Sequence, residues 1–395
     1  MVADFADLGR QRGERVGGLL REMVETIERV ANEREVDLDE YVDLARETMA
    51  GVPDRHLAEF EGMVDAVGID EERLALYGFA SSDLASDISD AADGDEDPAD
   101  DPEGCTNVVV SGDRTADGRP LILKNRDISA RGIRPQGLFE QPPIDDYHGF
   151  ISLTTCGEAF VFQGVNERGL VAANTFVDAE DEDVSRAGRI RNGVLVRRVL
   201  EECTDVADAR ALVADLDVNR VRGLTLALAD ERDAALIELD GEQDESRPAE
   251  GSVIVRTNHF PADEDAGGES SRARLARARE LADDLPDVVG VDDLFGIARD
   301  HENGPGPNSI CRHPTDDDGP LALGRSTTVS TAVFRGGESA FRGIVGNGCG
   351  SEPERYAYGE DHPDALLTGD RWRELVGGRT VDRGASESAR AAQSR

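Results

Sequence analysis

Residues 104–110 read Gly-Cys-Thr-Asn-Val-Val-Val, and this stretch decides how the chain is organised. It follows an acidic, turn-rich run at 91–103 and opens an apolar β pattern. If the Gly104–Cys105 bond is cut, Cys105 becomes an N-terminus that carries a nucleophilic thiol and a basic α-amine on one residue. A free α-amine has a pKa of about 7.7–8.0, so it is partly neutral near pH 8. The competing interpretation is an inert, buried cysteine at the start of a strand.

The composition is acidic and nearly free of lysine. The chain has 395 residues, with 83 Asp and Glu against 43 Lys and Arg, and its formal net charge is −40. Lys124 is the only lysine. Such a composition is typical of a cytoplasmic protein from a halophilic cell, where molar salt screens charge over about 3 Å, and we interpret the charge as a solubility feature. Nucleic acid is not an expected partner, because phosphate binding needs basic patches.

Targeting and cysteine patterns argue against several further classes of protein. No run of about 20 apolar residues is present, so no membrane partner is expected. Residues 1–5 lack the basic and apolar regions of a signal peptide, which favours a cytoplasmic location. The cysteines are odd in number, widely spread and without a CxxC pair, so we expect neither a disulfide framework nor a zinc site, and no cofactor. They are Cys105, Cys156, Cys203, Cys311 and Cys349.

Hydrophobic periodicity and composition divide the chain into four parts. Residues 1–87 carry apolar residues at helical spacing and are predicted to form a helical leader. Residues 88–104 are almost all acidic, small or proline, so we interpret them as an acidic processing linker. Residues 105–376 are predicted to form the catalytic domain, and the Ser-, Ala- and Arg-rich tail at 377–395 is predicted to be disordered.

Strands and blocks of helices alternate after residue 105. An Asp-Gly turn predicts a hairpin of the segments 107–111 and 121–124. Further strands are expected at 150–155, 159–163, 170–175, 224–229, 234–239, 253–257, 328–334 and 339–345, and helices at 189–201, 205–215, 271–281 and 292–299. Helices in blocks between hairpins favour two packed antiparallel sheets with helical layers outside, an α+β sandwich, over a parallel βαβ sheet.

Polar residues at two strand ends are candidates for chemistry beside Cys105. The hairpin register can bring Arg126 or Asp127 next to Cys105, where a carboxylate can hold an ammonium and an arginine can lower a thiol pKa. Asn258 ends another apolar strand, and its amide can donate to a developing oxyanion. The alternatives are a surface turn and a turn-forming asparagine. Lys124 lies at a strand end and is given no role.

Two other segments remain open in interpretation. His259 is the candidate base of a Cys-His protease that uses Cys105, an arrangement that tolerates wide sequence separation. The segment 311–313, Cys-Arg-His, is a second nucleophile site, a substrate-contact loop or a structural loop. Residues 166–170 and 174–175 are interpreted mainly as hairpin structure around a tight turn.

Several short segments, in their order along the chain, resemble one family. They are Phe60-Glu61-Gly62-Met63, Val67-Gly68-Ile69, Gly104-Cys105-Thr106, Lys124-Asn125-Arg126-Asp127, Gly164-Val165-Asn166-Glu167-Arg168-Gly169-Leu170, Thr257-Asn258-His259, Ser309-Ile310-Cys311-Arg312 and Gly346-Asn347-Gly348-Cys349. Their order and spacing are similar to those of the acyl-coenzyme A:6-aminopenicillanic acid acyltransferase (isopenicillin-N acyltransferase-like) family of cysteine N-terminal-nucleophile (Ntn) hydrolases. The resemblance runs from about residue 10 to residue 355.

The resemblance implies a four-layer αββα Ntn-hydrolase sandwich that is made as a precursor and cut before Cys105. The leader then stays bound to the rest of the chain as a partner. By matched position, Cys105 is nucleophile and base, Asp127 orients the amino group and Asn258 serves the oxyanion. Arg126 is implied to hold a carboxylate or the surroundings of Cys105. The acidic segment before Gly104 is unusually long for the family.

The expected reaction is hydrolysis or transfer of an acyl group through a thioester on Cys105. The implied substrate is a small-molecule amide or an acyl-CoA-like thioester, and we expect Ser309, Arg312 and Asn174 to border it. Two alternative functions are kept: an unprocessed binding protein on the same scaffold, and a thiol protease that uses Cys105 and His259.

Overall fold

The N-terminal part of the chain folds into four helices, as its helical spacing of apolar residues predicts. They are α1 (Phe5–Glu33), α2 (Leu38–Met49), α3 (Asp54–Val67) and α4 (Glu71–Asp93). Helices α1 and α3 touch through glycine: a Cβ on Gly9 would lie 1.8 Å from the main-chain oxygen of Glu59, and one on Gly62 would lie 2.0 Å from that of Ala6. The computed structural model describes residues 2–93, 103–177, 190–216, 223–239, 243–246, 252–261, 267–314, 319 and 321–377.

Two antiparallel sheets follow the helices. The six-stranded sheet has the order β10 (Val253–Arg256), β1 (Gly104–Val110), β2 (Leu121–Ile128), β11 (Thr327–Arg335), β12 (Ala340–Val345) and β13 (Glu354–Ala357). The seven-stranded sheet has the order β3 (Gln136–Gln141), β4 (Phe150–Thr155), β5 (Gln163–Asn166), β6 (Val171–Phe176), β7 (Leu224–Ala229), β8 (Ala234–Leu239) and β9 (Gln243–Ser246).

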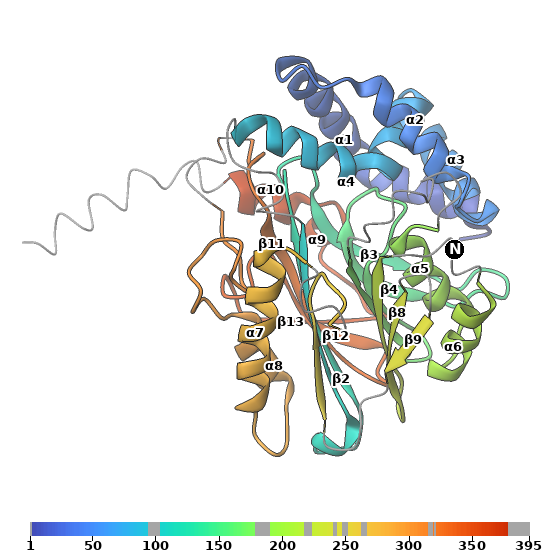
Figure 1. Ribbon diagram of the computed structural model, residues 1–395. Helices are drawn as coiled ribbons and strands as arrows, with labels where there is room; N and C mark the ends of the chain where they lie inside the picture. The colour runs from blue at the N-terminus through green and yellow to red at the C-terminus, as the bar shows by residue number, and fades with distance from the viewer. Residues whose placement is uncertain are drawn as a thin grey trace, which may run out of the picture.

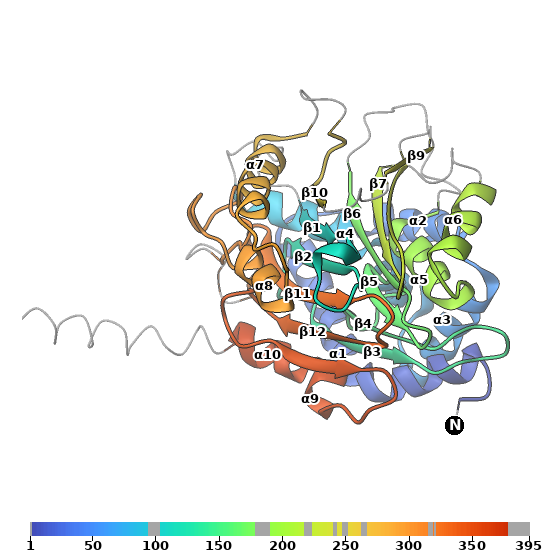
Figure 2. The ribbon, with the colours of Figure 1, turned by 90° about the horizontal axis from the view of Figure 1, so that it is seen from below.

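Helices cover the outer faces of both sheets. Figures 1 and 2 show α7 and α8 against the six-stranded sheet, while α5, α6 and the leader helices lie on the side of the seven-stranded sheet. The remaining helices of the described chain are α5 (Asn192–Glu202), α6 (Val206–Asp215), α7 (Glu269–Asp283), α8 (Val291–Ala298), α9 (Asp364–Leu367) and α10 (Asp370–Gly377), with a 3-10 turn at η2 (Gly112–Arg114). None of the described helices is long and apolar enough to span a bilayer.

Three apolar clusters correspond to the three interfaces between these layers. One joins the leader helices and α5 and α6 to the seven-stranded sheet, and includes Phe79 and Leu226. The second lies between the sheets and includes Val109, and the third joins the six-stranded sheet to α7 and α8 and includes Val108. Because neighbours in a strand point to opposite faces, Val108 and Val109 belong to different cores. The predicted α+β sandwich with αββα layers is confirmed.

The structure corrects one predicted strand. The segment 159–163 is not a strand, and only Gln163 belongs to β5. The main-chain N–H groups of Ala159 and Val161 donate to the main-chain oxygens of Gly78 in α4 and Gly193 in α5. This apolar segment therefore packs against helices and uses its hydrogen bonds there instead of pairing in a sheet.

The described residues include only the ends of the predicted acidic linker and exclude most of the predicted tail. Helix α4 continues through Asp93, past residue 88, where the linker was expected to begin. Residues 94–102 of that linker lie outside the described part of the chain, as do residues 378–395 of the predicted tail. The short elements β3, β9, β13, α9 and α10 were not predicted.

A buried ion-pair network joins the leader to α5. Glu59 of α3 accepts hydrogen bonds from Arg197 of α5 and from Arg12 of α1, and Arg197 Nε also donates to Glu201 Oε1 at 2.8 Å. Burial alone would raise the pKa of Glu59, but Arg197 and Arg12 hold it below its usual value. The depressed pKa means that the network stabilises the fold above about pH 4.3 and loses this contribution as the pH falls further.

We expect Glu59→Gln to lower the free energy of unfolding by about 3 kcal/mol, because it leaves buried arginine charge without its carboxylate. The control is Glu22→Gln, which removes an ion pair between α1 and Arg373 whose glutamate side chain is 59% exposed. That variant should lose less than about 1 kcal/mol. Denaturant unfolding in molar salt measures both, and equal losses would contradict the role given to the buried network.

Candidate active site

The register of β1 on β2 places Cys105 among charged side chains. Gly104 pairs with Asp127 and Cys105 pairs with Arg126 in the antiparallel ladder, as the predicted hairpin allowed. Cross-strand partners share a face of the sheet, so Cys105, Arg126 and Lys124 lie on the face that packs against the other sheet. Asp127 lies on the opposite face, toward α7. The Gly104–Cys105 peptide bond lies within β1, in the uncut chain.

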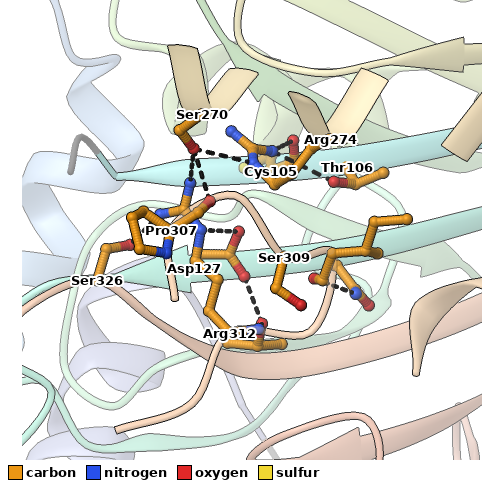
Figure 3. A network of polar contacts seen from close by, with 12 residues as sticks. Cys105, Thr106, Asp127, Ser270, Arg274, Pro307, Ser309, Arg312 and Ser326 are labelled. Carbon is orange, nitrogen blue, oxygen red and sulfur yellow. Dashed lines mark hydrogen bonds and ion pairs between the residues drawn. The ribbon is translucent and has the colours of Figure 1, made fainter. Parts of the chain in front are cut away.

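Two side chains hold the backbone of Cys105 from the other segments of the site. The Cys105 N–H donates to Asn258 Oδ1 at 2.9 Å, and the Cys105 main-chain oxygen accepts from Arg274 Nη1 at 2.6 Å. Arg274 of α7 also donates from Nη2 to Asn258 Oδ1 at 2.8 Å, and Figure 3 shows it beside Cys105 and Thr106. Arg274 is fully buried, and sequence reasoning missed it because it lies in a helix far from the strand ends.

Asn258 is in the predicted place, but its donor group is engaged elsewhere in the uncut chain. Its Nδ2 donates to the main-chain oxygen of Phe176 at 2.8 Å. Its main-chain N–H donates to Ser271 Oγ, also at 2.8 Å. An oxyanion role therefore requires Nδ2 to leave the Phe176 carbonyl.

Asp127 is a buried carboxylate directly beneath Gly104. Its Oδ1 accepts from Thr328 Oγ1 at 2.6 Å, and its Oδ2 lies 3.5 Å from Arg312 Nε. Asp127 Oδ2 has no hydrogen-bond donor among the described residues. A Cβ on residue 104 would lie 2.9 Å from Asp127 Oδ2 and 2.9 Å from Arg312 Nη2, so any larger residue would displace one of these side chains. A buried oxygen with unused hydrogen-bonding capacity therefore lies at the peptide bond that precedes Cys105.

Arg312 is fixed by several contacts on the same side of the sheet (Figure 3). Its Nη2 donates to Ser270 Oγ at 2.7 Å and its Nη1 donates to Ser326 Oγ at 2.8 Å. Its main-chain N–H donates to Thr328 Oγ1 at 2.9 Å, so Thr328 bridges Arg312 and Asp127. Arg312 thus acts on Asp127, and it does so from a fully buried position.

Lys124, the only lysine in the chain, is fully buried against Cys105. Its Nζ donates to the main-chain oxygen of Asn174, and Lys124 shares the inner face of the β1–β2 pair with Cys105. Burial lowers the pKa of the Lys124 ammonium, and the neighbouring Cys105 side chain opposes that shift. Its uniqueness in an arginine-rich chain was the signal that could have marked it in the sequence.

Arg126 reaches across to the seven-stranded sheet. Its Nη1 donates to Gln136 Oε1 at 2.8 Å, and its guanidinium lies over the Phe162 ring at 4.4 Å from the ring centroid. Burial lowers the pKa of Arg126, while Glu158, 3.8 Å away, opposes the shift. Arg126 and Lys124 together make the space between the sheets cationic next to Cys105.

The hydrogen bonds of the other predicted residues go to groups other than the thiol. Ser309 Oγ donates to the main-chain oxygens of Asp300 and Cys311, each at 3.0 Å, so it holds its own loop. Asn174 meets the site through its main-chain oxygen, which accepts from Lys124. His259 Nδ1 lies 2.8 Å from Ser271 Oγ, and the side-chain hydrogen bonds of His259 within the described chain do not include Cys105.

The thiol is covered in the uncut chain. Cys105 is 9% exposed. Glu103, two residues earlier, forms an ion pair with Arg134, which also donates to Ser82 Oγ of α4 at 3.0 Å. These contacts anchor the residues that precede Cys105 to the leader. An open hollow lined by Asp117, Arg119, Glu231 and Arg232 lies at the turn end of the β1–β2 hairpin, away from this site.

Comparison with known sequences gives one family. A family model described as acyl-coenzyme A:6-aminopenicillanic acid acyl-transferase matches residues 114–347. The matched region includes Arg126, Asp127, Asn258 and Arg312, whereas Cys105 precedes it. No curated protein sequence matches the chain.

The solved structures that match this chain at low identity include three hydrolases. Penicillin V acylase from Agrobacterium tumefaciens is 17% identical over 64% of this chain and 84% of its own, with a TM-score of 0.41. A Caenorhabditis elegans ortholog of N-acylethanolamine-hydrolyzing acid amidase is 11% identical over 58% of this chain and 92% of its own, with a TM-score of 0.43. A mutant of conjugated bile acid hydrolase from Clostridium perfringens is 13% identical over 65% of this chain and 99% of its own, with a TM-score of 0.42.

The bridge between Asp127 and Arg312 gives a prediction about stability. We expect Thr328→Val to lower the free energy of unfolding by about 2 kcal/mol, because it leaves a buried carboxylate oxygen without its donor. Thr327→Val is the matched control, since within the described residues the Thr327 hydroxyl makes one contact, of 3.4 Å, to the main-chain oxygen of Arg325. Denaturant unfolding in molar salt compares them. Similar losses in both variants would contradict the importance of the bridge.

Proposed function

Because the chain belongs to the acyl-coenzyme A:6-aminopenicillanic acid acyl-transferase family, we propose that it is an autoprocessing amidohydrolase or acyltransferase with Cys105 as its nucleophile. Cleavage of the Gly104–Cys105 bond divides the chain into residues 1–104 and 105–395. The leader stays bound, since the Glu59 network and the shared apolar core join it to the seven-stranded sheet. The observation that carries the proposal is the unsatisfied Asp127 Oδ2 at the bond to be cut.

The first step of the proposal is self-cleavage. The Cys105 thiolate attacks the Gly104 carbonyl carbon, so a C–S bond forms, the C–N bond breaks and the departing nitrogen takes a proton. Water then hydrolyses the thioester, which releases a Gly104 carboxylate and restores the thiol. In the precursor the Cys105 nitrogen is still an amide and cannot act as a base. Lys124 supplies the missing base, because it lies on the same face of the β1–β2 pair as the thiol and burial lowers its pKa.

Cleavage supplies a hydrogen-bond donor for Asp127 Oδ2. In the uncut chain the Cys105 nitrogen donates to Asn258 Oδ1, so the freed α-amino group turns away from Asn258 to reach Asp127 Oδ2, which can hold and orient it. Arg312 and Thr328 in turn keep Asp127 in place. The amine then serves as the general base for turnover, while Arg274 holds the main-chain oxygen of Cys105.

Turnover follows the same chemistry on an external acyl group. The thiol attacks the carbonyl of a small-molecule amide or thioester, and the oxyanion is held by Asn258 Nδ2 once it leaves the Phe176 carbonyl. One preorganised donor of this kind contributes about 3 kcal/mol. Two further residues carry buried polar atoms without hydrogen-bond partners in the described chain: Asn107, on the same face of β1 as Cys105, and Thr175. These atoms can form hydrogen bonds with polar groups of a substrate. Arg126 provides a cation for a substrate carboxylate.

The first test is Cys105→Ala, which removes the nucleophile. We expect this variant to stay as one chain and to show no hydrolase activity, whereas Cys203→Ala, which replaces a buried cysteine at the end of α5, should be cleaved normally. Denaturing electrophoresis and an amide-hydrolysis assay in molar salt report both. Normal cleavage of Cys105→Ala would rule out the scheme. A wild-type chain that stays uncut, with a thiol at Cys105 inert to iodoacetamide, would favour the binding-protein alternative.

The second test is Lys124→Arg, which keeps the positive charge but removes a group able to act as a base. We expect self-cleavage to slow by about 10²-fold or more, the usual contribution of general base catalysis. The rate is measured by following the two chains after refolding into molar salt. His259→Ala is the comparison, because the Cys-His alternative predicts that this variant loses its activity and that the chain stays uncut. Normal cleavage of Lys124→Arg would contradict the role of Lys124.

A further inference from the structure

Two cysteines and two histidines gather outside the candidate active site. They are His301, Cys311, His313 and Cys349, and one potential ligand atom of each lies within 4.8 Å of all the others. The chain has only six histidines and five cysteines, so this cluster takes a large share of both residue types. We propose that the cluster is a structural zinc site with two sulfur and two nitrogen ligands.

The distances between the ligand atoms suit a tetrahedral ion. His301 Nε2 lies 2.8 Å from His313 Nε2, which lies 3.2 Å from Cys349 Sγ and 3.8 Å from Cys311 Sγ. Zinc binds nitrogen at about 2.0–2.1 Å and sulfur at about 2.3 Å, which separates ligand atoms in a tetrahedron by about 3.3–3.8 Å. Small side-chain rotations therefore bring all four atoms onto one ion.

The chemistry of the ligand set selects zinc or a similar soft ion. Two thiolates with two imidazoles form a closed tetrahedral set that leaves no position for water, as in structural zinc sites. The two imidazole Nε2 atoms face each other at 2.8 Å, and both thiols face His313 Nε2. No carboxylate belongs to the cluster.

The ligands come from two connections, the one between α8 and β11 and the one between β12 and β13. His301 follows α8, Cys311 and His313 belong to the same loop, and Cys349 lies in the loop after β12. The Cys311 N–H donates to the main-chain oxygen of Asp300 at 3.2 Å, and the His313 N–H donates to that of Pro305 at 2.9 Å. These hydrogen bonds hold the loop in the shape that presents both of its ligands on one side.

The site joins the candidate active site through one residue. Arg312 lies between Cys311 and His313, and its side chain holds Asp127. Its main-chain oxygen accepts from Asn347 Nδ2, two residues before Cys349. A zinc ion at the cluster therefore fixes the loop that carries Arg312 to the loop after β12. This inference does not rest on the proposed function, because the ion would bind whether or not the chain is cleaved.

The test is the zinc content of the full chain, purified under reducing conditions in molar salt without chelator. Inductively coupled plasma mass spectrometry should find about one zinc per chain. Cys349→Ser and His301→Asn should each lower the zinc content at least about tenfold. Cys349 is exposed, so its replacement leaves the packed core intact. The controls Cys203→Ser and His148→Asn, which alter residues outside the cluster, should keep the wild-type content.

Extended X-ray absorption fine structure at the zinc edge supplies a second readout. We expect two sulfur ligands at about 2.3 Å and two nitrogen ligands at about 2.0 Å. Zinc chloride added to metal-free wild-type chain should bind with the same dependence on Cys349. A wild-type chain that takes up no zinc would overturn the proposal. So would a zinc content that Cys349→Ser leaves unchanged, which would indicate binding to the acidic surface, or a Cys311–Cys349 disulfide in the freshly purified chain.

Discussion

The pairing register of β1 and β2 is the constraint on which the rest of the site depends. It sets Gly104 over Asp127 and Cys105 beside Arg126. A slip by one residue would move every side chain of β1 to the other face of the sheet, and the thiol would then face α7 instead of the other sheet. The apolar side chains of the two strands prevent such a slip, because Val108 and Val109 belong to separate cores on the two faces.

The charge buried near Cys105 differs from the charge of the chain as a whole. The chain as a whole is strongly acidic, yet its interior near Cys105 holds Arg126, Arg274, Arg312 and Lys124. Arginine suits the fixed positions, since its planar group bonds several acceptors and does not lose its proton. The one buried lysine is different, because an amine with a lowered pKa can give up a proton and accept one from a thiol. This difference gives a chemical reason for a single lysine in a chain that otherwise uses arginine.

Local patterns were sufficient to predict part of the fold. Strands β7 and β8 have the predicted bounds, because one apolar run ends before the polar turn 230–233 and the other begins after it. The segment 159–163 has similar composition but packs on α4 and α5, a tertiary outcome that no local pattern reveals. Strand β3 was missed because Gln136–Gln141 begins and ends with glutamine and contains a glycine, which hides its alternation.

The candidate site was predictable where one hairpin brings residues together and where Asn258 ends a strand. The Asp-Gly turn predicted that Arg126 and Asp127 lie beside Cys105, since hairpin register follows from the strands and the turn. Arg274 reaches Cys105 from α7. The cluster of His301, Cys311, His313 and Cys349 forms from the loop after α8 and the loop after β12, so both arrangements depend on how distant elements pack. The lack of a CxxC pair argued against zinc only for sites whose ligands are neighbours in the sequence.

The central claim is that the sulfur and the terminal nitrogen of Cys105 come to belong to one free N-terminal residue. Its most direct test is intact mass measurement with N-terminal sequencing of the wild-type protein, purified in molar salt. The account predicts two polypeptides, one that ends at Gly104 and one whose first residue is Cys105. A single polypeptide of 395 residues that nevertheless hydrolyses an amide substrate would contradict it.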